Sequence, residues 1–450
     1  MRVALLLVVL LVAGCLGAPS VPTPAPSVGG KTVALPGGTT LQIAGQKAGV
    51  STIATSGSDA AIDFPAGVLV KDAKGELRPV KGPFNLAAGA SVTFLPPYGA
   101  HNLTLKVNGA DVPVTLEEGD RLVSGDFAVD LMKIQRAQFP HRTPSMPNYA
   151  KSEAYFAAFF KALNYTVELN TYPGGAITLP AADKPGPGSF ESVVATKKGT
   201  TKADRYLVFG GHFDVVEQTT EGAFDNTAGA IATLVVAQAF ANLTTEHSII
   251  FGEWGGEEDG LMGSEAWLSS HPQLVPFIDG YVNFDVTSLA WPAPKVDPAP
   301  IVVASGPDGP IADNLAKAAQ DIEKTYLQSG AKFIYESVAQ GQANGHKVNA
   351  QSDHSSFMSR GIPVYFPFTS KVPDAFTIIH SEKDTVENMT KYSLKGVEGI
   401  GQDATPAEMA EGEWYLARSF ETQMGLGFYF VILVDDGTIT VSPAPSPLPS

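Results

Sequence analysis

The sequence contains a single cysteine, Cys15, among its 450 residues. One cysteine cannot form a framework of internal disulfide bonds, and it cannot supply a zinc site built from several thiolates. Basic residues are also few, because 30 Lys and Arg stand against 46 Asp and Glu and give a formal net charge of -16. Nucleic-acid binding requires a basic face, so this balance argues against DNA or RNA as a partner.

The chain also lacks an apolar run of the roughly 20 residues that a membrane-spanning helix needs. The apolar stretch 3–13 follows a short charged start and precedes small residues, which is typical of an export signal. Residues 12–15, VAGC, resemble the lipobox of prokaryotic lipoproteins, which implies cleavage before Cys15 and a lipid on its thiol. The alternative is an ordinary secretory signal. We expect an exported protein, on the outer face of the membrane or secreted, with a lipid at Cys15 as its only membrane anchor.

The remaining chain divides by composition. Hydrophobic residues make up 44% and charged residues 17%, which predicts a packed globular body. After a Pro/Ser-rich tether, short alternating runs separated by turn residues predict β-strands, and Asn108-Gly109 suits a tight hairpin. We find no chemical constellation in this β region. The predicted organisation is a signal peptide at 1–14, a lipidated cysteine and tether at 15–30, a small β domain at 31–119, an α/β domain at 120–435 and a disordered Pro-rich tail at 436–450.

From about residue 120 strand patterns alternate with helical ones. Residues 151–163 carry aromatic side chains at helical spacing, and residues 227–241 form an apolar stretch that suits a buried helix. Such alternation predicts an α/β fold with a doubly wound, mostly parallel sheet. The apolar segment 427–434 is too short to span a membrane, and we interpret it as a further strand. The stretch 291–300 is Pro-rich and suits a local insertion.

Three apolar runs, 206–209, 248–254 and 281–284, lead into acidic or imidazole side chains. Short apolar runs bounded by glycine are typical of buried parallel strands. In open α/β sheets the functional site lies beyond the carboxyl ends of the strands, so these polar groups are expected on one rim. The residues concerned are His212 and Asp214 after the first run, Glu257 and Glu258 after the second, and Asp285 after the third.

Each of these residues alone has an ordinary structural explanation, such as a surface pair or an exposed acidic turn. Together they indicate a metal site, because zinc-type cations accept carboxylates and neutral imidazoles. Adjacent carboxylates such as Glu257 and Glu258 repel each other unless a cation is present. Asp225, before the apolar helix, and His380 complete a set that serves two metals if one carboxylate bridges them.

Six segments resemble, in order and spacing, the M28 family of zinc peptidases: HFD, GAFDNTAG, GEEDGLMGS, NFD, SDHSSF and IIHSEKDTVEN. The resemblance covers about residues 120–401 and implies the zinc-dependent exopeptidase fold, two Zn²⁺ ions and peptide substrates. By position, it implies that His212 and Asp285 bind one zinc, that Glu258 and His380 bind the other, and that Asp225 bridges them. It also implies that Glu257 is the general base, and that Asp214 lies behind His212 and orients its imidazole.

An aminopeptidase is the function that we favour from this resemblance. An M28-like carboxypeptidase is an alternative, for which Arg360 could hold the substrate carboxylate. Asp353 and His354, in the SDH segment, receive no role. We also weigh a single-zinc glutaminyl cyclase and a non-catalytic surface-binding lipoprotein. A terminal helix after Asn388, usual in this family, is only weakly marked in the sequence.

Overall fold

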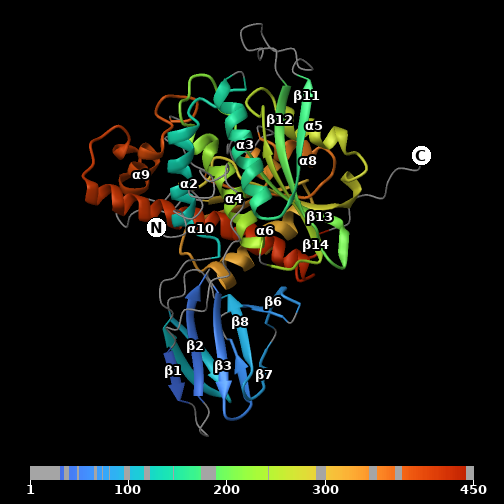
Figure 1. Ribbon diagram of the computed structural model, residues 1–450, viewed down its shortest axis with the longest axis vertical. Coiled ribbons are helices and arrows are strands. Elements are labelled where there is room, and N and C mark those ends of the chain that lie inside the picture. Colours follow the sequence, from blue (N-terminus) through green and yellow to red (C-terminus); the bar gives the residue numbers. More distant parts are fainter. Residues whose placement is uncertain are drawn as a thin grey trace, which may run out of the picture.

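The computed structural model shows an all-β portion followed by an α/β portion (Figure 1). Cys15, the predicted signal and tether, the stretch 291–300 and the end of the tail lie outside the described residues. The structure describes residues 31–34, 40–47, 50–64, 68–72, 74–80, 82–95, 102–115, 122–144, 146–173, 189–241, 243–289, 301–343, 352–369 and 378–441.

The N-terminal portion contains two antiparallel sheets, ordered β1-β2-β3-β8-β5-β6 and β10-β9-β4-β7. Their inner side chains, including Phe64 and Phe94 with ring centroids 4.9 Å apart, form a separate small core. The predicted hairpin is present, since Asn108 and Gly109 have φ of 51° and 81° between β9 and β10. The strands are β1 Lys31–Ala34, β2 Thr40–Lys47, β3 Val50–Ser56, β4 Ala60–Asp63, β5 Leu69–Lys71, β6 Leu77–Pro79, β7 Phe84–Leu86, β8 Ser91–Leu95, β9 Asn102–Val107 and β10 Ala110–Thr115.

The α/β portion is built on an eight-stranded sheet ordered β11-β12-β14-β13-β15-β18-β16-β17. The four central strands, β14, β13, β15 and β18, are parallel, which confirms the predicted fold class. The sheet is mixed overall, because β11 and β12 pair antiparallel on one side and β16 pairs antiparallel with β18 on the other. The strands are β11 Thr166–Pro173, β12 Ser189–Lys197, β13 Lys202–His212, β14 His247–Trp254, β15 Ile278–Asn283, β16 Ile301–Gly306, β17 Phe333–Ser337 and β18 Val364–Thr369.

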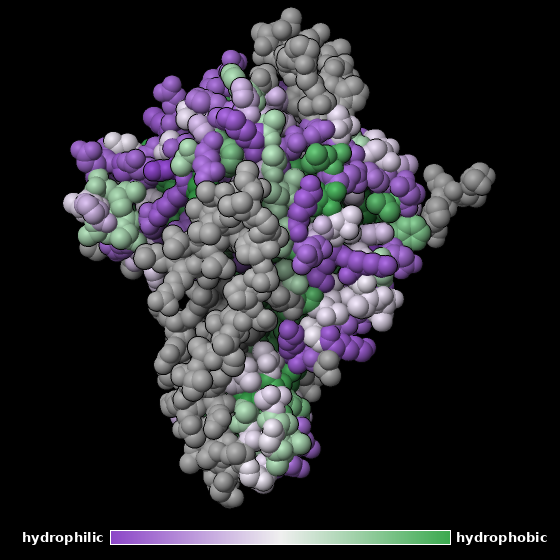
Figure 2. Space-filling model, in the orientation of Figure 1, coloured by the Kyte–Doolittle hydropathy of each residue, from purple (hydrophilic) through white to green (hydrophobic). Residues whose placement is uncertain are grey.

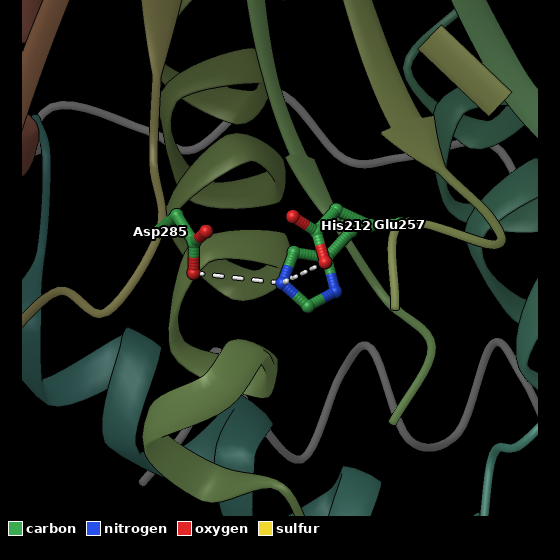
Figure 3. A group of neighbouring side chains, drawn as sticks. All are labelled: His212, Glu257 and Asp285. Carbon is green, nitrogen blue, oxygen red and sulfur yellow. Dashed lines mark ion pairs between the residues drawn. The ribbon is translucent and has the colours of Figure 1, made fainter. Parts of the chain in front are cut away.

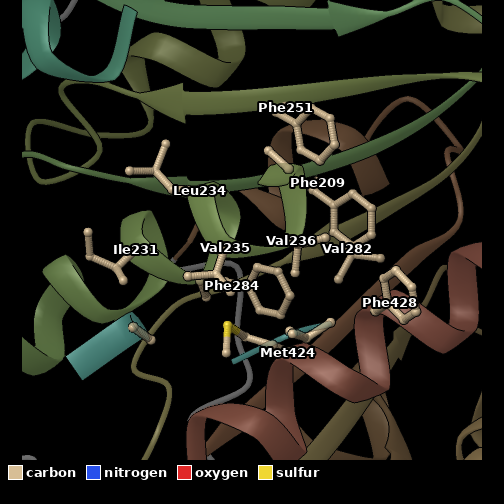
Figure 4. Packing of buried hydrophobic residues seen from close by; sticks show 14 of the residues in the cluster. Phe209, Ile231, Leu234, Val235, Val236, Phe251, Val282, Phe284, Met424 and Phe428 are labelled. Carbon is tan, nitrogen blue, oxygen red and sulfur yellow. The ribbon is translucent and has the colours of Figure 1, made fainter. Parts of the chain in front are cut away.

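Helices cover both faces of this sheet. On one face Phe209, Phe251 and Val282 pack against α4 and α10, where Phe428 contributes to the same core (Figure 4). Hydrophilic residues prevail over much of the visible surface of the α/β portion (Figure 2). The helices are α2 Gly125–Gln138, α3 Pro147–Ala162, α4 Ala228–Ala241, α5 Met262–Ser270, α6 Pro310–Ile322, α7 Val338–Ala343, α8 His354–Met358, α9 Val386–Lys395 and α10 Pro406–Asp435, with short helical turns at Ala223–Thr227, Val275–Phe277, Glu323–Leu327 and Gly396–Gly399.

The prediction for residues 427–434 is wrong, because this segment lies in α10 and not in a strand. The helix begins with a capping box, in which Thr405 and Glu408 bind each other's backbone N–H groups. Its second half is buried on all sides, so it carries no polar face from which a helical period could be recognised. The expectation of a weakly marked terminal helix is corrected likewise, since α9 and α10 are both well formed. Within the described part of the chain, no helix combines the length and apolarity needed to cross a membrane.

The β portion contacts the α/β portion at the amino ends of the central strands. Arg78 of β6 lies 2.7 Å from Glu246, just before β14, and also binds Glu76. The backbone N–H of Thr244 donates to the carbonyl of Gly75 at 3.1 Å. This junction is at the opposite end of β14 from the polar residues that follow the strand.

A buried histidine lies beside this junction. The Nδ1 atom of His247 is 2.7 Å from Oδ1 of Asp435, at the end of α10, and its Nε2 atom is 3.3 Å from Oδ2 of Asp279, in β15. Arg205 donates to Asp279 at 2.8 Å, and Lys202 faces the same cluster. Burial lowers the pKa of His247, but its bonds to Asp279 and Asp435 outweigh burial and raise the pKa above its usual value. The imidazole therefore links two strands to α10, and its two carboxylate partners favour the protonated form.

We predict that His247→Gln destabilises the protein in a pH-dependent way. Because folding raises the pKa of His247, its stabilising effect is complete below about pH 6.5 and is lost as the pH rises through the folded-state value. The substitution should lower the free energy of unfolding by about 1.5–3 kcal/mol at pH 6, the range for hydrogen bonds to a charged group. It should cost less at pH 9.

Chemical denaturation of the metal-free proteins at both pH values would measure this difference. His271→Gln, which changes a partly exposed histidine at the end of α5, is the control. An equal cost at pH 6 and pH 9 would contradict the proposed charge state of His247.

Candidate metal centre

The carboxyl ends of three neighbouring strands bring the predicted site residues together. His212 is the last residue of β13, Glu257 and Glu258 follow β14, and Asp285 follows β15. Because β14, β13 and β15 are adjacent and parallel, these ends lie on one rim of the sheet. Asp225 joins them from the turn Ala223–Thr227, which leads into α4.

His212 is fully buried and faces several carboxylates. Its Nε2 atom is 3.3 Å from Oδ1 of Asp225 and 3.5 Å from Oδ1 of Asp285. Oε2 of Glu257 is 3.8 Å from the same nitrogen (Figure 3). Within the part of the chain that the structure describes, neither ring nitrogen makes a hydrogen bond of good geometry. Such an imidazole, aimed at acidic oxygens without bonding them, is arranged as a metal ligand would be.

Asp225 lies between the two histidines. Its Oδ1 atom faces His212, whereas its Oδ2 atom is 3.1 Å from Nε2 of His380. The same nitrogen of His380 is 3.2 Å from Oε2 of Glu258. The side chains therefore form two groups that share Asp225. Group 1 comprises His212, Asp225 and Asp285, and group 2 comprises Asp225, Glu258 and His380.

Glu257 gives an alternative grouping. Its carboxylate could join His212 and Asp285, because their ligand atoms lie within 4.8 Å of one another. The ligand atoms of His212, Asp225 and Glu258 also lie within 4.8 Å of one another. Nε2 of His212 lies closer to Asp225 and Asp285, at 3.3 and 3.5 Å, than to Glu257, at 3.8 Å, and on this ground we place Glu257 beside group 1 and not in it. The His380 side chain is 52% exposed, so solvent reaches the centre on the side of group 2.

Asp214 connects the end of β13 with the glutamate turn. Its carboxylate accepts the backbone N–H groups of Glu257 and Glu258, both at 3.2 Å. Oδ1 of Asp214 is also 3.4 Å from Nδ1 of His212. A carboxylate behind a ligating imidazole fixes its orientation and raises its basicity. Asp214 thus holds the two glutamates through their backbone and lies close behind the imidazole of His212.

Two further buried residues support the centre, and the sequence offered no signal for either. Asp384 accepts the N–H groups of Phe224 at 2.7 Å and Asp225 at 3.0 Å, which holds the turn that carries Asp225. Asp384 stands four residues after His380 in the segment IIHSEKDTVEN, but nothing in that spacing distinguishes it from a surface acid.

Arg142 is the second of these residues and is fully buried. Its guanidinium donates to the carbonyl of Phe213 at 2.9 Å and to Oγ1 of Thr227 at 2.6 Å. It therefore ties the segment between His212 and Asp214 to the end of the turn that carries Asp225. Burial lowers the pKa of Arg142 to about 10, so it remains a cation at neutral pH.

Without a cation, burial disfavours the ionised forms of Glu257 and Glu258. Burial raises the pKa of Glu257 well above its usual value, and the charges of Asp285 and Glu258 raise it further. Burial and Asp225 raise the pKa of Glu258 to about 7. The bonds to Asp225 and Glu258 raise the pKa of His380 to about 10. Metal binding at group 2 would release the protons of Glu258 and His380, because metals bind deprotonated ligands.

The donor set therefore fits divalent metal ions. Two imidazoles and several carboxylates converge in a buried place, and no thiolate contributes, which suits a zinc-type cation. The shared position of Asp225 allows two ions, one at each group.

The remaining sequence candidates lie near the centre or on the surface. Asp353 and His354 are buried at the start of α8, and burial raises the pKa of Asp353 to about 7. The His354 ring packs against Phe366 at 4.6 Å. Arg360 donates two hydrogen bonds to the carboxylate of Glu265 in α5, one of them at 2.8 Å. The structure thus shows Arg360 engaged by an acidic partner.

Residues 192–400, which contain every residue of groups 1 and 2, match peptidase family M28. The part of the chain that carries the metal centre is therefore similar to M28 peptidases. The matched region begins within β12 and ends after α9, so it includes the central strands and their rim.

Curated proteins with similar sequences include "Probable zinc metalloprotease" of Pyrenophora tritici-repentis, 28% identical over 221 residues, which are 44% of this chain and 45% of that protein. "Probable leucine aminopeptidase 2" of Trichophyton verrucosum is 27% identical over 223 residues, 45% of this chain and 41% of that protein. The matches thus span less than half the length of these relatives. Among solved structures, the aminopeptidase of Aneurinibacillus sp. strain AM-1 aligns with a TM-score of 0.47 and 15% identity, over 68% of this chain and 93% of that chain.

We predict that Asp384→Asn weakens metal binding at this centre although it changes no residue of groups 1 and 2. The amide group of Asn offers one acceptor oxygen, so one of the two N–H groups in the turn with Asp225 loses its partner. Loss of such an outer partner typically lowers metal affinity by about 10–100-fold. Zn²⁺ titration in competition with a chromogenic chelator would measure the change.

Glu382→Gln is the matched control, because Glu382 is an exposed acid two residues earlier. Identical titrations for wild type and Asp384→Asn would show that Asp384 does not hold the position of Asp225.

Proposed function

We propose that this protein is a zinc-dependent aminopeptidase. The observation that carries the proposal is the position of Asp225, whose two carboxylate oxygens face His212 and His380 separately. The match of residues 192–400 to peptidase family M28 supports hydrolysis of peptide bonds. A relative named as a zinc metalloprotease supports zinc as the metal, and a relative named as a leucine aminopeptidase supports cleavage at the amino end of the substrate.

The proposed ligands follow the two groups. His212 and Asp285 would hold one Zn²⁺ ion, Glu258 and His380 would hold the other, and Asp225 would serve both. Glu257 and Asp214 remain free of metal. Bound zinc would polarise the peptide carbonyl and bring the pKa of a water molecule to about 7.

Glu257 acts as the general base in this proposal. Its carboxylate accepts a proton from the attacking water and delivers it to the leaving amine. A base for this task works best with a pKa near the operating pH, and burial raises the pKa of Glu257 in that direction. Asp214 keeps the carboxylate in place, because it binds the backbone N–H groups of residues 257 and 258.

The basic side chains near the centre bear on the choice between the two exopeptidases. Arg142 is buried and is already bound to the carbonyl of Phe213 and to Thr227. A carboxypeptidase needs a cation for the substrate carboxylate. Arg360, the sequence candidate for that role, is already bound to Glu265. We therefore prefer the aminopeptidase to the M28-like carboxypeptidase.

A glutaminyl cyclase and a non-catalytic binding lipoprotein each make a different prediction. The cyclase would bind one zinc ion, whereas the division of Asp225 between two histidines favours two. The binding lipoprotein would need no complete ligand set, yet every proposed ligand is present. Metal analysis distinguishes the cyclase from the aminopeptidase, and hydrolysis distinguishes the binding lipoprotein from both enzymes.

The function is tested with chromogenic aminoacyl, N-acyl-peptide and N-terminal glutaminyl substrates, each with and without a chelator. We expect hydrolysis of free aminoacyl substrates only, lost with chelator and regained with Zn²⁺. Two zinc ions per chain should be found in the active protein. Activity on N-acyl-peptides alone would indicate the carboxypeptidase, and cyclisation with one zinc would indicate the cyclase.

Two variants with the same change of charge separate the roles of the adjacent glutamates. Glu257→Gln cannot accept a proton, so turnover should fall by about 10²–10⁴-fold while two zinc ions stay bound. Glu258→Gln should weaken one ion, and added Zn²⁺ should restore part of the activity. Loss of metal in the first variant with full retention in the second would mean that we have reversed the roles.

We also propose that the protein is exported and anchored by a lipid at Cys15, which lies outside the described residues. Cys15→Ser should release the protein from the membrane fraction or block its processing, because the thiol that receives the lipid is gone. Membrane fractionation and intact mass measure both effects. An unchanged mass and an unchanged distribution would exclude the anchor.

A further inference from the structure

The loop that follows Asp285 has an unusual backbone. Val286 and Ser288 have φ angles of 39° and 78°, in the left-handed region that residues other than glycine seldom adopt. For Val286 this is more unusual still, because its branched Cβ crowds the backbone there. Such a conformation persists only where surrounding contacts hold it in place.

The side chain of Gln423 in α10 binds the loop directly. Its Oε1 atom accepts the backbone N–H of Ser288 at 2.5 Å and the hydroxyl of Thr287. Its Nε2 atom donates to Oγ1 of Thr369, at the end of β18, at 3.0 Å. All of these residues are buried. One amide group thus links the terminal helix, the loop and a central strand.

Thr369 completes the attachment of the loop. Its Oγ1 atom also accepts the backbone N–H of Leu289 at 3.1 Å, and its own N–H donates to the carbonyl of Val286 at 3.0 Å. Both of the left-handed residues are therefore bound by either Gln423 or Thr369. If Gln423 is removed, Thr287 and Ser288 lose their partner and the hydroxyl of Thr369 loses one of its two donors.

This loop determines where the Asp285 carboxylate points. On the preceding side, Phe284 is fixed because its N–H donates to the carbonyl of Gly210 at 2.8 Å. On the following side, Oδ1 of Asp285 accepts the N–H of Val286 at 2.7 Å. That oxygen is the one 3.5 Å from Nε2 of His212. A change in the backbone of Val286 would therefore move the carboxylate relative to His212.

We propose that Gln423 is a positioning residue for the metal at group 1, acting on Asp285 through residues 286–289. It touches neither ligand nor substrate. The inference rests on the proposed function only in that group 1 binds a metal ion. It differs from a general stabilising role because group 2, with Glu258 and His380, should be unaffected.

The test is Zn²⁺ titration of the full chain in competition with a chelator. Gln423→Leu keeps a similar volume and removes all three hydrogen bonds. We expect one of the two zinc ions to bind about 10–100-fold more weakly, the range for loss of an outer partner, while the other binds as in wild type. Excess Zn²⁺ should then restore most of the turnover with KM nearly unchanged.

Thr422→Val is the matched control, because Thr422 is the buried neighbour on α10 and its hydroxyl binds Arg418 within the same helix. Thr369→Val keeps the shape of the residue but removes the hydroxyl of β18 that accepts hydrogen bonds from Leu289 and Gln423. It should weaken the same single ion and serves as the deciding variant if Gln423→Leu does not fold.

The outcomes separate this inference from the proposed function. If wild type binds two ions and hydrolyses aminoacyl substrates, but the variants at residues 423 and 369 titrate like Thr422→Val, only the role of Gln423 is overturned. Equal weakening of both ions would also overturn it, since that pattern indicates general destabilisation. A wild-type protein that binds no zinc would overturn both.

Discussion

The confinement of several carboxylates around two imidazoles is the constraint on which the rest of the structure depends. Asp225 faces both histidines, and Glu257, Glu258 and Asp285 lie beside it in a mostly buried place. Like charges at this proximity are costly, and burial adds to the cost. Divalent cations offset this cost, because each ionised carboxylate then binds a cation or lies beside a residue that does. The site therefore makes physical sense as a metal centre.

Keeping such a centre in place requires support from residues that do not bind metal. Asp214 holds the glutamate turn, and Asp384 holds the turn that carries Asp225. Arg142 joins the end of β13 to the same turn, whereas Gln423 holds the loop beyond Asp285. These supports come from elements far apart in the sequence. Their shared feature is a buried polar side chain that binds the backbone next to a ligand.

The two ends of the central sheet have different tasks. The carboxyl ends carry the metal centre, and the amino ends carry the junction with the β portion, where Arg78 meets Glu246 and His247 lies between two carboxylates. β14 runs from the junction to the glutamate turn in 8 residues, so at 3.3 Å per residue its two ends are about 23 Å apart. The contacts of Arg78 and His247 therefore lie far from the rim that carries the metal centre.

Local patterns were enough to predict much of this protein. Short apolar runs before His212, Glu257 and Asp285 predicted central parallel strands, and the topology of such sheets predicted that these residues meet. The hairpin at Asn108-Gly109 was predictable because its conformation depends on those two residues. By contrast, the second half of α10 was mistaken for a strand, since a helix buried on all sides has no polar face.

Only the tertiary structure identified the supporting residues and the antiparallel margins of the sheet. A buried Arg142, Asp384 or Gln423 has no distinguishing neighbours in sequence, because its partners are backbone groups 71, 159 and 135 residues away. The convergence of acidic and imidazole side chains after the central strands was predictable, because their chemistry and their place after apolar runs are local properties. Their supports were not, because a hydrogen bond to distant backbone exists only once the chain has folded.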